Sequence, residues 1–240
     1  MAHHVSPRRK LKALLVLLVL ITLTVAAPAC SPRVFNDGTY TGISQGDSHG
    51  YGIAEVTIEK DKISRVKLTE MTEVGEEKDY ETYPWPKAKE AKDTLEKAFV
   101  GRQDTNVDAV TQATNSSNKF KEAVGFALEK ARKKPTITST YFEGTFQGRS
   151  QADDHGWGVA WVTIQGDKIT DVEVEDVTPE GEFKDWATYN YPPAIEAKAE
   201  MPKRFVSANS ATVDAYTGAT NSSTKWMEAV SAALAAAKIR

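Results

Sequence analysis

Apolar and polar residues alternate along three short stretches early in the chain, and the same alternation returns 106 residues later. The predicted strands are Thr39–Ser44, Gly52–Glu59 and Lys62–Glu70 in the first unit, and Thr145–Ser150, Gly158–Gln165 and Lys168–Asp176 in the second. Lys60-Asp61 and Gly166-Asp167 are the expected hairpin turns. Each unit is therefore predicted to begin with a small antiparallel sheet.

Helical spacing of apolar residues follows each predicted sheet. Pro86 and Pro193 suit the first turn of a helix. The predicted helices are Lys87–Val100 and Ala194–Val206, followed by a second pair from about Ser116 to Ala131 and from Ser222 to Lys238. Strands followed by helices predict an α+β fold, with two tandem small domains that each have an antiparallel sheet with helices packed on it.

The whole pattern is a duplication without gaps. VDAVTQATNSS at 107–117 returns as VDAYTGATNSS at 213–223, with 9 of 11 residues identical. Loops usually diverge faster than core elements, so this strictly kept segment is the candidate for the function. The predicted domain boundaries are a signal at 1–29, a tether at 30–36, domains at 37–132 and 141–240, and a linker at 133–140.

The first 29 residues are predicted to be an export signal. Four basic residues are followed by an apolar stretch, and Ala27-Pro28-Ala29 precedes Cys30. A cysteine directly after a small-residue cleavage site resembles the lipobox of bacterial lipoproteins, which implies lipidation of Cys30. One alternative is an uncleaved anchor, although its about 15 apolar residues fall short of the ~20 that span a bilayer. A twin-arginine signal at Arg8-Arg9 is the other alternative.

Charge and cysteine content narrow the possible functions. Four of the 30 basic residues precede Cys30, whereas all 33 acidic residues follow it, so the exported part is acidic. An acidic protein is poorly suited to binding nucleic acid. Cys30 is the only cysteine, which excludes an internal disulfide. The predicted location is extracytoplasmic, with the protein anchored by lipid to the cell membrane.

A threonine-containing polar segment precedes the second predicted helix of each unit. Thr114 and Thr220 stand immediately before the expected helix starts. The free N–H groups and the dipole of a helix start favour an anion bound to or attached at the threonine. The alternative is that these residues only cap the helix.

Several neighbours of each threonine are kept together at the same offset, whereas a cap would need only one residue. The kept neighbours are Asp108, Thr111, Ala113, Asn115 and Ser116 beside Thr114, and Asp214, Thr217, Ala219, Asn221 and Ser222 beside Thr220. This joint retention favours a functional role for the segment.

At these residues the chain resembles the FMN-binding domain family. This family includes the covalently flavinylated subunits of sodium-pumping NADH:quinone reductase and of the related Rnf complex, and the flavin lipoproteins of extracellular electron transfer. The family pattern is Asp-x-x-[Ser/Thr]-[Gly/Ala]-Ala-Thr. DAYTGAT at 214–220 matches it fully, and DAVTQAT at 108–114 departs at Gln112. The DGTYTG opening and the Gly-rich bend also resemble the family, over about 37–131 and 143–238.

The resemblance implies that a flavin transferase takes FAD, joins its FMN moiety by a phosphoester to the hydroxyls of Thr114 and Thr220, and releases AMP. Two covalent FMN cofactors follow, held by the residues of the motif. Asp108 and Asp214 would serve recognition by the transferase or orient the loop. Their alternative role is a hydrogen bond within a turn.

Histidines and aromatic residues are further candidates for flavin contacts. His49 and His155 lie in Gly-rich bends and are expected to contact the flavin ring, or else to be solvated loop residues. Four aromatic residues are candidates either for stacking on the ring or for the core: Tyr80, Tyr83, Trp186 and Tyr189. The sequence shows no metal-ligand spacing, no nucleophile triad and no phosphate loop.

These features predict a lipid-anchored flavoprotein that carries electrons, rather than an enzyme with its own substrate. Its expected partners are the flavin transferase, a membrane-bound quinol-linked donor and an extracellular acceptor. One alternative is a flavin-dependent extracellular reductase with its own small substrate. The other is a non-redox surface lipoprotein that uses the duplicated fold only for binding.

Overall fold

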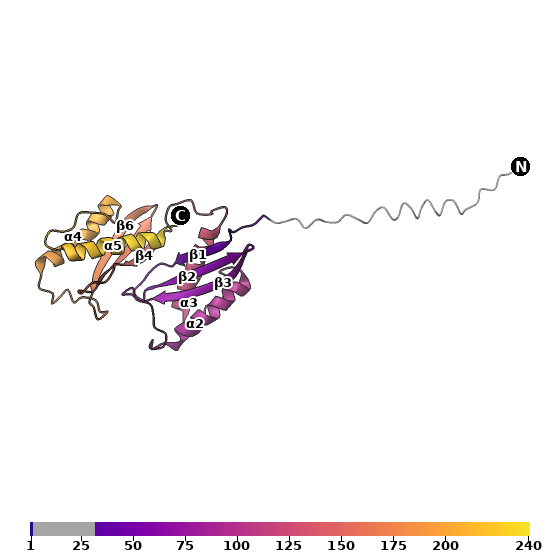
Figure 1. Ribbon diagram of the computed structural model, residues 1–240, viewed down its shortest axis with the longest axis horizontal. Coiled ribbons are helices and arrows are strands. Elements are labelled where there is room, and N and C mark those ends of the chain that lie inside the picture. The colour runs from indigo at the N-terminus through magenta and orange to yellow at the C-terminus, as the bar shows by residue number, and fades with distance from the viewer. Residues whose placement is uncertain (2–31) are drawn as a thin grey trace. The chain divides into compact units, whose positions relative to one another are not determined.

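The alternation of apolar and polar side chains builds a three-stranded antiparallel sheet in each repeat (Figure 1). The strands are β1 (Gly38–Ile43), β2 (Tyr51–Glu59) and β3 (Lys62–Met71), and then β4 (Gly144–Arg149), β5 (Trp157–Gln165) and β6 (Lys168–Val177). Both sheets are ordered in sequence, and each predicted strand is confirmed to within one residue at each end. Every second side chain of β2, from Ala54 to Ile58, is buried, as the pattern requires.

This computed structural model describes residue 1 and residues 32–240. Residues 2–29 of the predicted signal, and the predicted lipidation site Cys30, lie outside the described residues. Arg33–Arg240 form one unit that contains both repeats. Within residues 32–240, no helix has the length and apolar character needed to cross a bilayer.

Four helices complete the two repeats. They are α2 (Pro86–Arg102) and α3 (Thr114–Ala131) in repeat 1, and α4 (Pro192–Ala208) and α5 (Thr220–Ala237) in repeat 2. The strands and helices bear out the predicted α+β fold with two repeated units. The predicted start of the second helix in each repeat was wrong by two residues, because α3 and α5 begin at the threonine itself.

Close contact between helix and strand explains why glycine occupies the second-last position of β1 and of β4. Helix α3 packs on β1 and β2, and α5 packs on β4 and β5. A Cβ atom at Gly42 would lie 2.0 Å from the Ala123 carbonyl oxygen, and one at Gly148 would lie 2.1 Å from the Ala229 carbonyl oxygen. Only glycine lets the backbones approach this closely.

The two repeats contact one another through the bend that follows β3. The Trp157 indole N–H donates to the Val74 carbonyl at 2.7 Å, and the Gln147 side-chain amide donates to the Glu73 carbonyl at 2.8 Å. Nearer the linker, the rings of Phe126 and Phe142 stack with centroids 3.9 Å apart.

The predicted linker is held against repeat 1. The Glu129 carboxylate accepts hydrogen bonds from the backbone N–H and hydroxyl of Thr136, both at 2.6 Å, and from the Ile137 N–H at 3.0 Å. Burial alone would raise the Glu129 pKa, but these hydrogen bonds lower it overall. The segment therefore joins the repeats as an ordered connection.

Replacement of Trp157 tests how strongly the repeats depend on this contact. Trp157 is 4% exposed, so Trp157→Ala is expected to lower the free energy of unfolding by about 3–5 kcal/mol through lost packing. Trp157→Phe keeps much of the packing and should cost less, with about 1 kcal/mol from the lost hydrogen bond. Urea unfolding followed by circular dichroism measures the stability of both variants. A Trp157→Ala protein as stable as the wild type would contradict a contribution of Trp157 packing to stability.

Candidate functional site

A tight turn leads into α3 and α5 at the threonine segment. The Ala113 N–H donates to the Val110 carbonyl at 2.9 Å, and the Ala219 N–H donates to the Tyr216 carbonyl at 3.0 Å. The residue before each alanine is left-handed, with φ of 66° at Gln112 and 83° at Gly218. Glycine adopts this conformation without strain, whereas glutamine does not. The departure of repeat 1 from the motif therefore carries a backbone cost.

A buried serine, the last of the kept motif residues, holds this turn. The Ser117 hydroxyl accepts the Val110 N–H at 3.0 Å and donates to the Ala113 carbonyl at 2.8 Å. In repeat 2, the Ser223 hydroxyl accepts the Tyr216 N–H at 3.0 Å. Both serines are fully buried, so their role in each repeat is to fix the turn.

The threonines are the first residues of their helices, and their side chains are exposed. Ala113 and Ala219 occupy the N-cap positions, and neither helix has a side-chain cap hydrogen bond. The capping alternative for this segment is therefore wrong. Thr114 and Thr220 instead lie beside first-turn N–H groups that no side chain caps, which is a favourable place for an anion.

The first serine of each segment, Ser116 or Ser222, reaches a buried carboxylate at the end of the third strand. The Ser116 hydroxyl donates to Glu70 at 2.9 Å, and the Lys78 ammonium lies 3.0 Å from the same Glu70 oxygen. In repeat 2, Ser222 donates to Asp176 at 2.9 Å and Lys184 pairs with the same Asp176 oxygen at 2.5 Å.

Sequence reasoning missed the role of these lysines and carboxylates. Lys78-Asp79 returns as Lys184-Asp185 at the 106-residue offset, which was the available signal. Glu70 and Asp176 differ in type, so no shared motif marked them. The structure shows that each lysine and carboxylate pair joins the end of the third strand to the helix start.

The histidine bends are fixed by a second charged pair. Asp47 accepts the backbone N–H of His49 at 2.7 Å and pairs with Lys119 at 2.7 Å. Partial burial alone would raise the Asp47 pKa, but the hydrogen bonds from Lys119 and His49 lower it overall.

The equivalent bend of repeat 2 has the same construction with one further bond. Asp153 pairs with Lys225 at 2.5 Å and accepts the Asn221 side-chain amide at 2.9 Å. The hydrogen bond from Lys225, followed by that from Asn221, holds the pKa of Asp153 well below its usual range. The His155 bend is therefore tied directly to the helix that begins at Thr220.

A cavity of about 490 Å³ opens around Thr220 in repeat 2. Motif residues, the histidine bend and two tyrosines share its wall; the lining residues are Asp154, His155, Thr178, Pro179, Lys184, Tyr189, Tyr191, Ala194, Gly218, Ala219, Thr220, Asn221 and Ser222. His155 and Tyr189 thus lie in the same pocket as Thr220, and their contact with a flavin ring stays a prediction.

Other sequence candidates lie outside this cavity. Trp186 does not line it, and its indole N–H donates to Glu175 at 2.6 Å. Asp214 and Thr217 are exposed and do not line it either. In the part of the chain from 32 to 240, no hydrogen bond involves the carboxylate of Asp108 or Asp214, so the turn-bonding alternative for these residues is not found.

The site of repeat 1 shows the same candidates in corresponding places. Asp108, Thr111 and His49 are exposed. Tyr80 is partly buried and donates to Glu70 at 3.3 Å, and burial, followed by the nearby Glu70 charge, raises the Tyr80 pKa. Tyr83 lies under the Lys78 ammonium, 4.1 Å from ring centroid to Nζ.

An aromatic residue outside the predicted set anchors each motif turn. The Trp85 indole N–H donates to the Gln112 carbonyl, and the Tyr191 hydroxyl donates to the Gly218 carbonyl, both at 2.8 Å. The two residues differ in type but hold the left-handed residue in the same way. This bond explains why an aromatic residue stands just before α2 and α4.

Comparison with known proteins agrees with this arrangement. The family model described as the FMN-binding domain matches residues 50–129 and 156–235, once in each repeat. The chain belongs to the FMN-binding domain family. Both repeats are therefore FMN-binding domains, as the resemblance in the sequence predicted. Among the described residues, no group of three or more His, Cys, Asp or Glu side chains is placed to hold a metal ion.

Two individual proteins resemble parts of this FMN-binding chain. An uncharacterized protein from Treponema pallidum (strain Nichols) is 34% identical over 114 residues, which are 48% of this chain and 28% of that protein. The match thus covers just over a quarter of that relative's length. The crystal structure of the CPE2226 protein from Clostridium perfringens covers 40% of this chain and 88% of its own, with 22% identity and a TM-score of 0.35.

The pocket of repeat 2 fits FMN in size and in chemistry. Its volume of about 490 Å³ is within the range of small-molecule sites. The first turn of α5 offers N–H groups to a phosphate, and Tyr189 and Tyr191 offer apolar surface to a ring.

Exchanging the residues at the left-handed position tests how much Gln112 lowers the free energy of unfolding relative to glycine. Gln112→Gly is expected to raise the free energy of unfolding by about 1 kcal/mol, because glycine relieves the left-handed strain. Gly218→Gln should lower it by at least as much, since a Cβ there would also lie 3.1 Å from the Pro193 Cβ.

A matched control for this exchange is Gly101→Gln. Gly101 lies in α2 with nothing within 4 Å of an added Cβ, so this change should be neutral or slightly stabilising. Urea unfolding measures all three variants, and equal effects of Gly218→Gln and Gly101→Gln would contradict the conformational explanation.

Removal of Lys78 tests the buried pair. Both Lys78 and Glu70 are less than 8% exposed, so Lys78→Met leaves a buried carboxylate without its cation and should cost about 3–5 kcal/mol of stability. Lys87→Met removes a lysine from the exposed pair with Glu90 and should change stability by less than about 1 kcal/mol. Thermal unfolding compares the two, and similar melting temperatures would refute a structural role for Lys78.

Proposed function

We propose that this protein is an extracytoplasmic electron carrier that holds FMN covalently on Thr114 and Thr220. The observation that supports it most directly is the position of Thr220, which is exposed at the first residue of α5 and lines a cavity of suitable size. The threonine hydroxyl caps no helix and is therefore available to form a phosphoester. Membership of the FMN-binding domain family indicates that the cofactor is FMN.

The residues around Thr220 have separate tasks in this proposal. The first-turn N–H groups of α5 bind the phosphate, and Ser222 is held in place by Asp176. The ring occupies the cavity beside His155 and Tyr189. Asp153 keeps the histidine bend closed over this end of the cavity through its bonds to Lys225 and Asn221.

The remaining motif residues act before or around attachment. The exposed residues Asp108 and Thr111, with Asp214 and Thr217, form the surface that a flavin transferase reads on the turn. Ala113 and Ala219 are buried and hold the N-cap position beneath it. His49 serves repeat 1 as His155 serves repeat 2. Bound FMN supplies one-electron and two-electron redox chemistry, which the protein positions and exposes.

The proposed cellular role places this carrier at the cell surface. Lipid on Cys30 anchors it to the membrane, where a quinol-linked donor supplies electrons and an extracellular acceptor removes them. Covalent attachment suits this place, since a dissociating cofactor would be lost outside the cell. A flavin-dependent reductase is the second candidate, because a second cavity shares Lys184 with the pocket of Thr220.

Mass spectrometry of exported protein tests attachment. Protein made in cells that contain a flavin transferase is expected to gain the mass of two FMN moieties, and Thr114→Ala and Thr220→Ala are each expected to remove one. Thr224→Ala alters an exposed threonine one turn further along α5 and should remove none. An unmodified wild type, from cells that flavinylate a control protein, would refute covalent attachment.

A further inference from the structure

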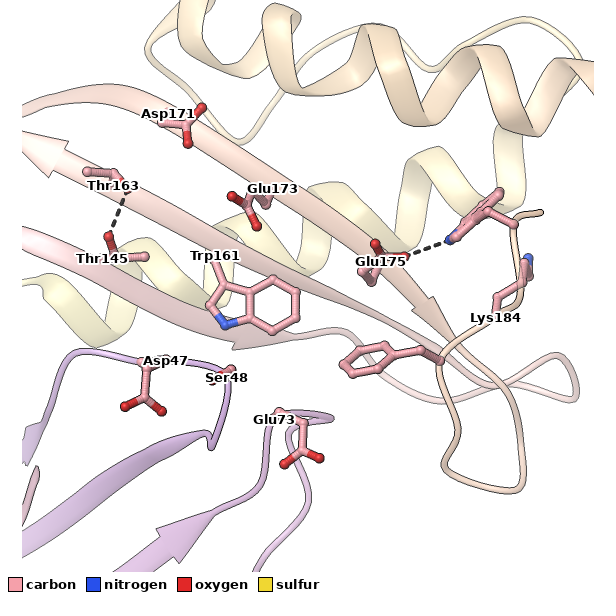
Figure 2. Close-up of a pocket in the computed structure, with 13 residues that line it drawn as sticks. Asp47, Ser48, Glu73, Thr145, Trp161, Thr163, Asp171, Glu173, Glu175 and Lys184 are labelled. Carbon is pink, nitrogen blue, oxygen red and sulfur yellow. Dashed lines mark hydrogen bonds between the residues drawn. The ribbon is translucent and has the colours of Figure 1, made fainter. Parts of the chain in front are cut away.

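A second cavity, of about 550 Å³, lies on the outer face of the second sheet (Figure 2). Its floor carries Trp161 from β5 and Glu173 from β6, which are directly paired across the two strands. Segments of repeat 1 that carry Ser48 and Glu73 form the opposite wall. Figure 2 shows Trp161 and Glu173 projecting from the sheet toward these segments. The cavity is therefore lined by residues of both repeats.

The equivalent face of repeat 1 differs from this surface in its charge and in its aromatic residues. The residues that correspond at the 106-residue offset to Trp161, Asp171, Glu173 and Phe183 are Glu55, Arg65, Lys67 and Glu77. In repeat 1 these charges balance, and Lys67 lies 3.9 Å from Glu55. In repeat 2 both basic residues are replaced by acids and both acids by aromatic residues. The motif turn and the lysine–carboxylate pair of the flavin site are found in both repeats. The change in charge therefore lies on the outer face of the sheet.

Aromatic surface and unpaired negative charge coincide in the cavity. The Trp161 and Phe183 rings lie 6.2 Å apart at 49°, and Phe183 is 40% exposed. Within residues 32–240, no ion pair involves Glu73, Asp171 or Glu173, three of the acids that line it. Asp47 and Glu175, by contrast, are paired with Lys119 and Lys198.

We propose that this cavity binds a planar organic cation, with its ring against Trp161 and Phe183 and its charge beside Asp171 and Glu173. Aromatic faces attract cations, and nearby carboxylates without partners add Coulomb attraction. The volume is within the range of small-molecule sites. Because Lys184 lines both cavities, the ligand lies next to the pocket of Thr220. This binding is independent of whether FMN is attached.

Binding of proflavine, a planar cation, tests the proposal by isothermal titration calorimetry. The full chain and the Thr114→Ala/Thr220→Ala variant, which removes both proposed attachment sites, should both bind it. This comparison separates the cavity from the proposed flavin function. Acridine, uncharged at pH 7.5, should bind at least about tenfold more weakly.

Variants that restore the residues of repeat 1 locate the site. Glu173→Lys and Trp161→Glu should each weaken proflavine binding by about tenfold or more. Glu59→Lys changes the net charge as Glu173→Lys does, but at an exposed residue outside the cavity, and should leave binding unchanged. Circular dichroism confirms that the variants remain folded.

Several outcomes would overturn the proposal. These are no proflavine binding, equal binding of acridine, or an equal loss in Glu59→Lys and Glu173→Lys. A lysine-rich peptide that binds where proflavine does not would also overturn it, and would identify the face as a surface for a basic protein.

Discussion

A buried carboxylate paired with a lysine holds each candidate site together. Glu70 with Lys78, and Asp176 with Lys184, join the end of the third strand to a serine in the first turn of the following helix. Because these groups are removed from water, their geometry must satisfy both charges at once. The helix start, and with it the exposed threonine, is fixed relative to the sheet by this requirement.

Comparison of the two repeats shows which features of the candidate site are the same in both and which differ. The lysine pairs, the turn serines and the aspartates of the histidine bends recur in both repeats with closely similar bonds. Identity is not required where only a hydrogen-bond donor matters, as Trp85 and Tyr191 show. The outer faces of the sheets have no such constraint, and one face has become aromatic and acidic while the other remains balanced.

The bend after β3 takes part both in the contact between the repeats and in the second cavity. The bend after β3 that Trp157 and Gln147 hold also supplies Glu73 to the second cavity. In repeat 2 the equivalent bend supplies Thr178 and Pro179 to the pocket of Thr220. The same structural segment thus serves a pocket in one repeat and a contact between repeats in the other.

The sequence by itself determined the duplication, the strands, the hairpin turns and the FMN-binding family, because periodic side chains and a repeated motif are local signals. Only the tertiary structure decided that each threonine begins its helix, because the carboxylate that holds the first turn comes from the end of the third strand. It also decided which charges pair, as Glu70 and Lys78 meet only when strand and bend fold together. The acidic aromatic cavity was likewise beyond sequence reasoning, since its walls come from strands and loops of both repeats.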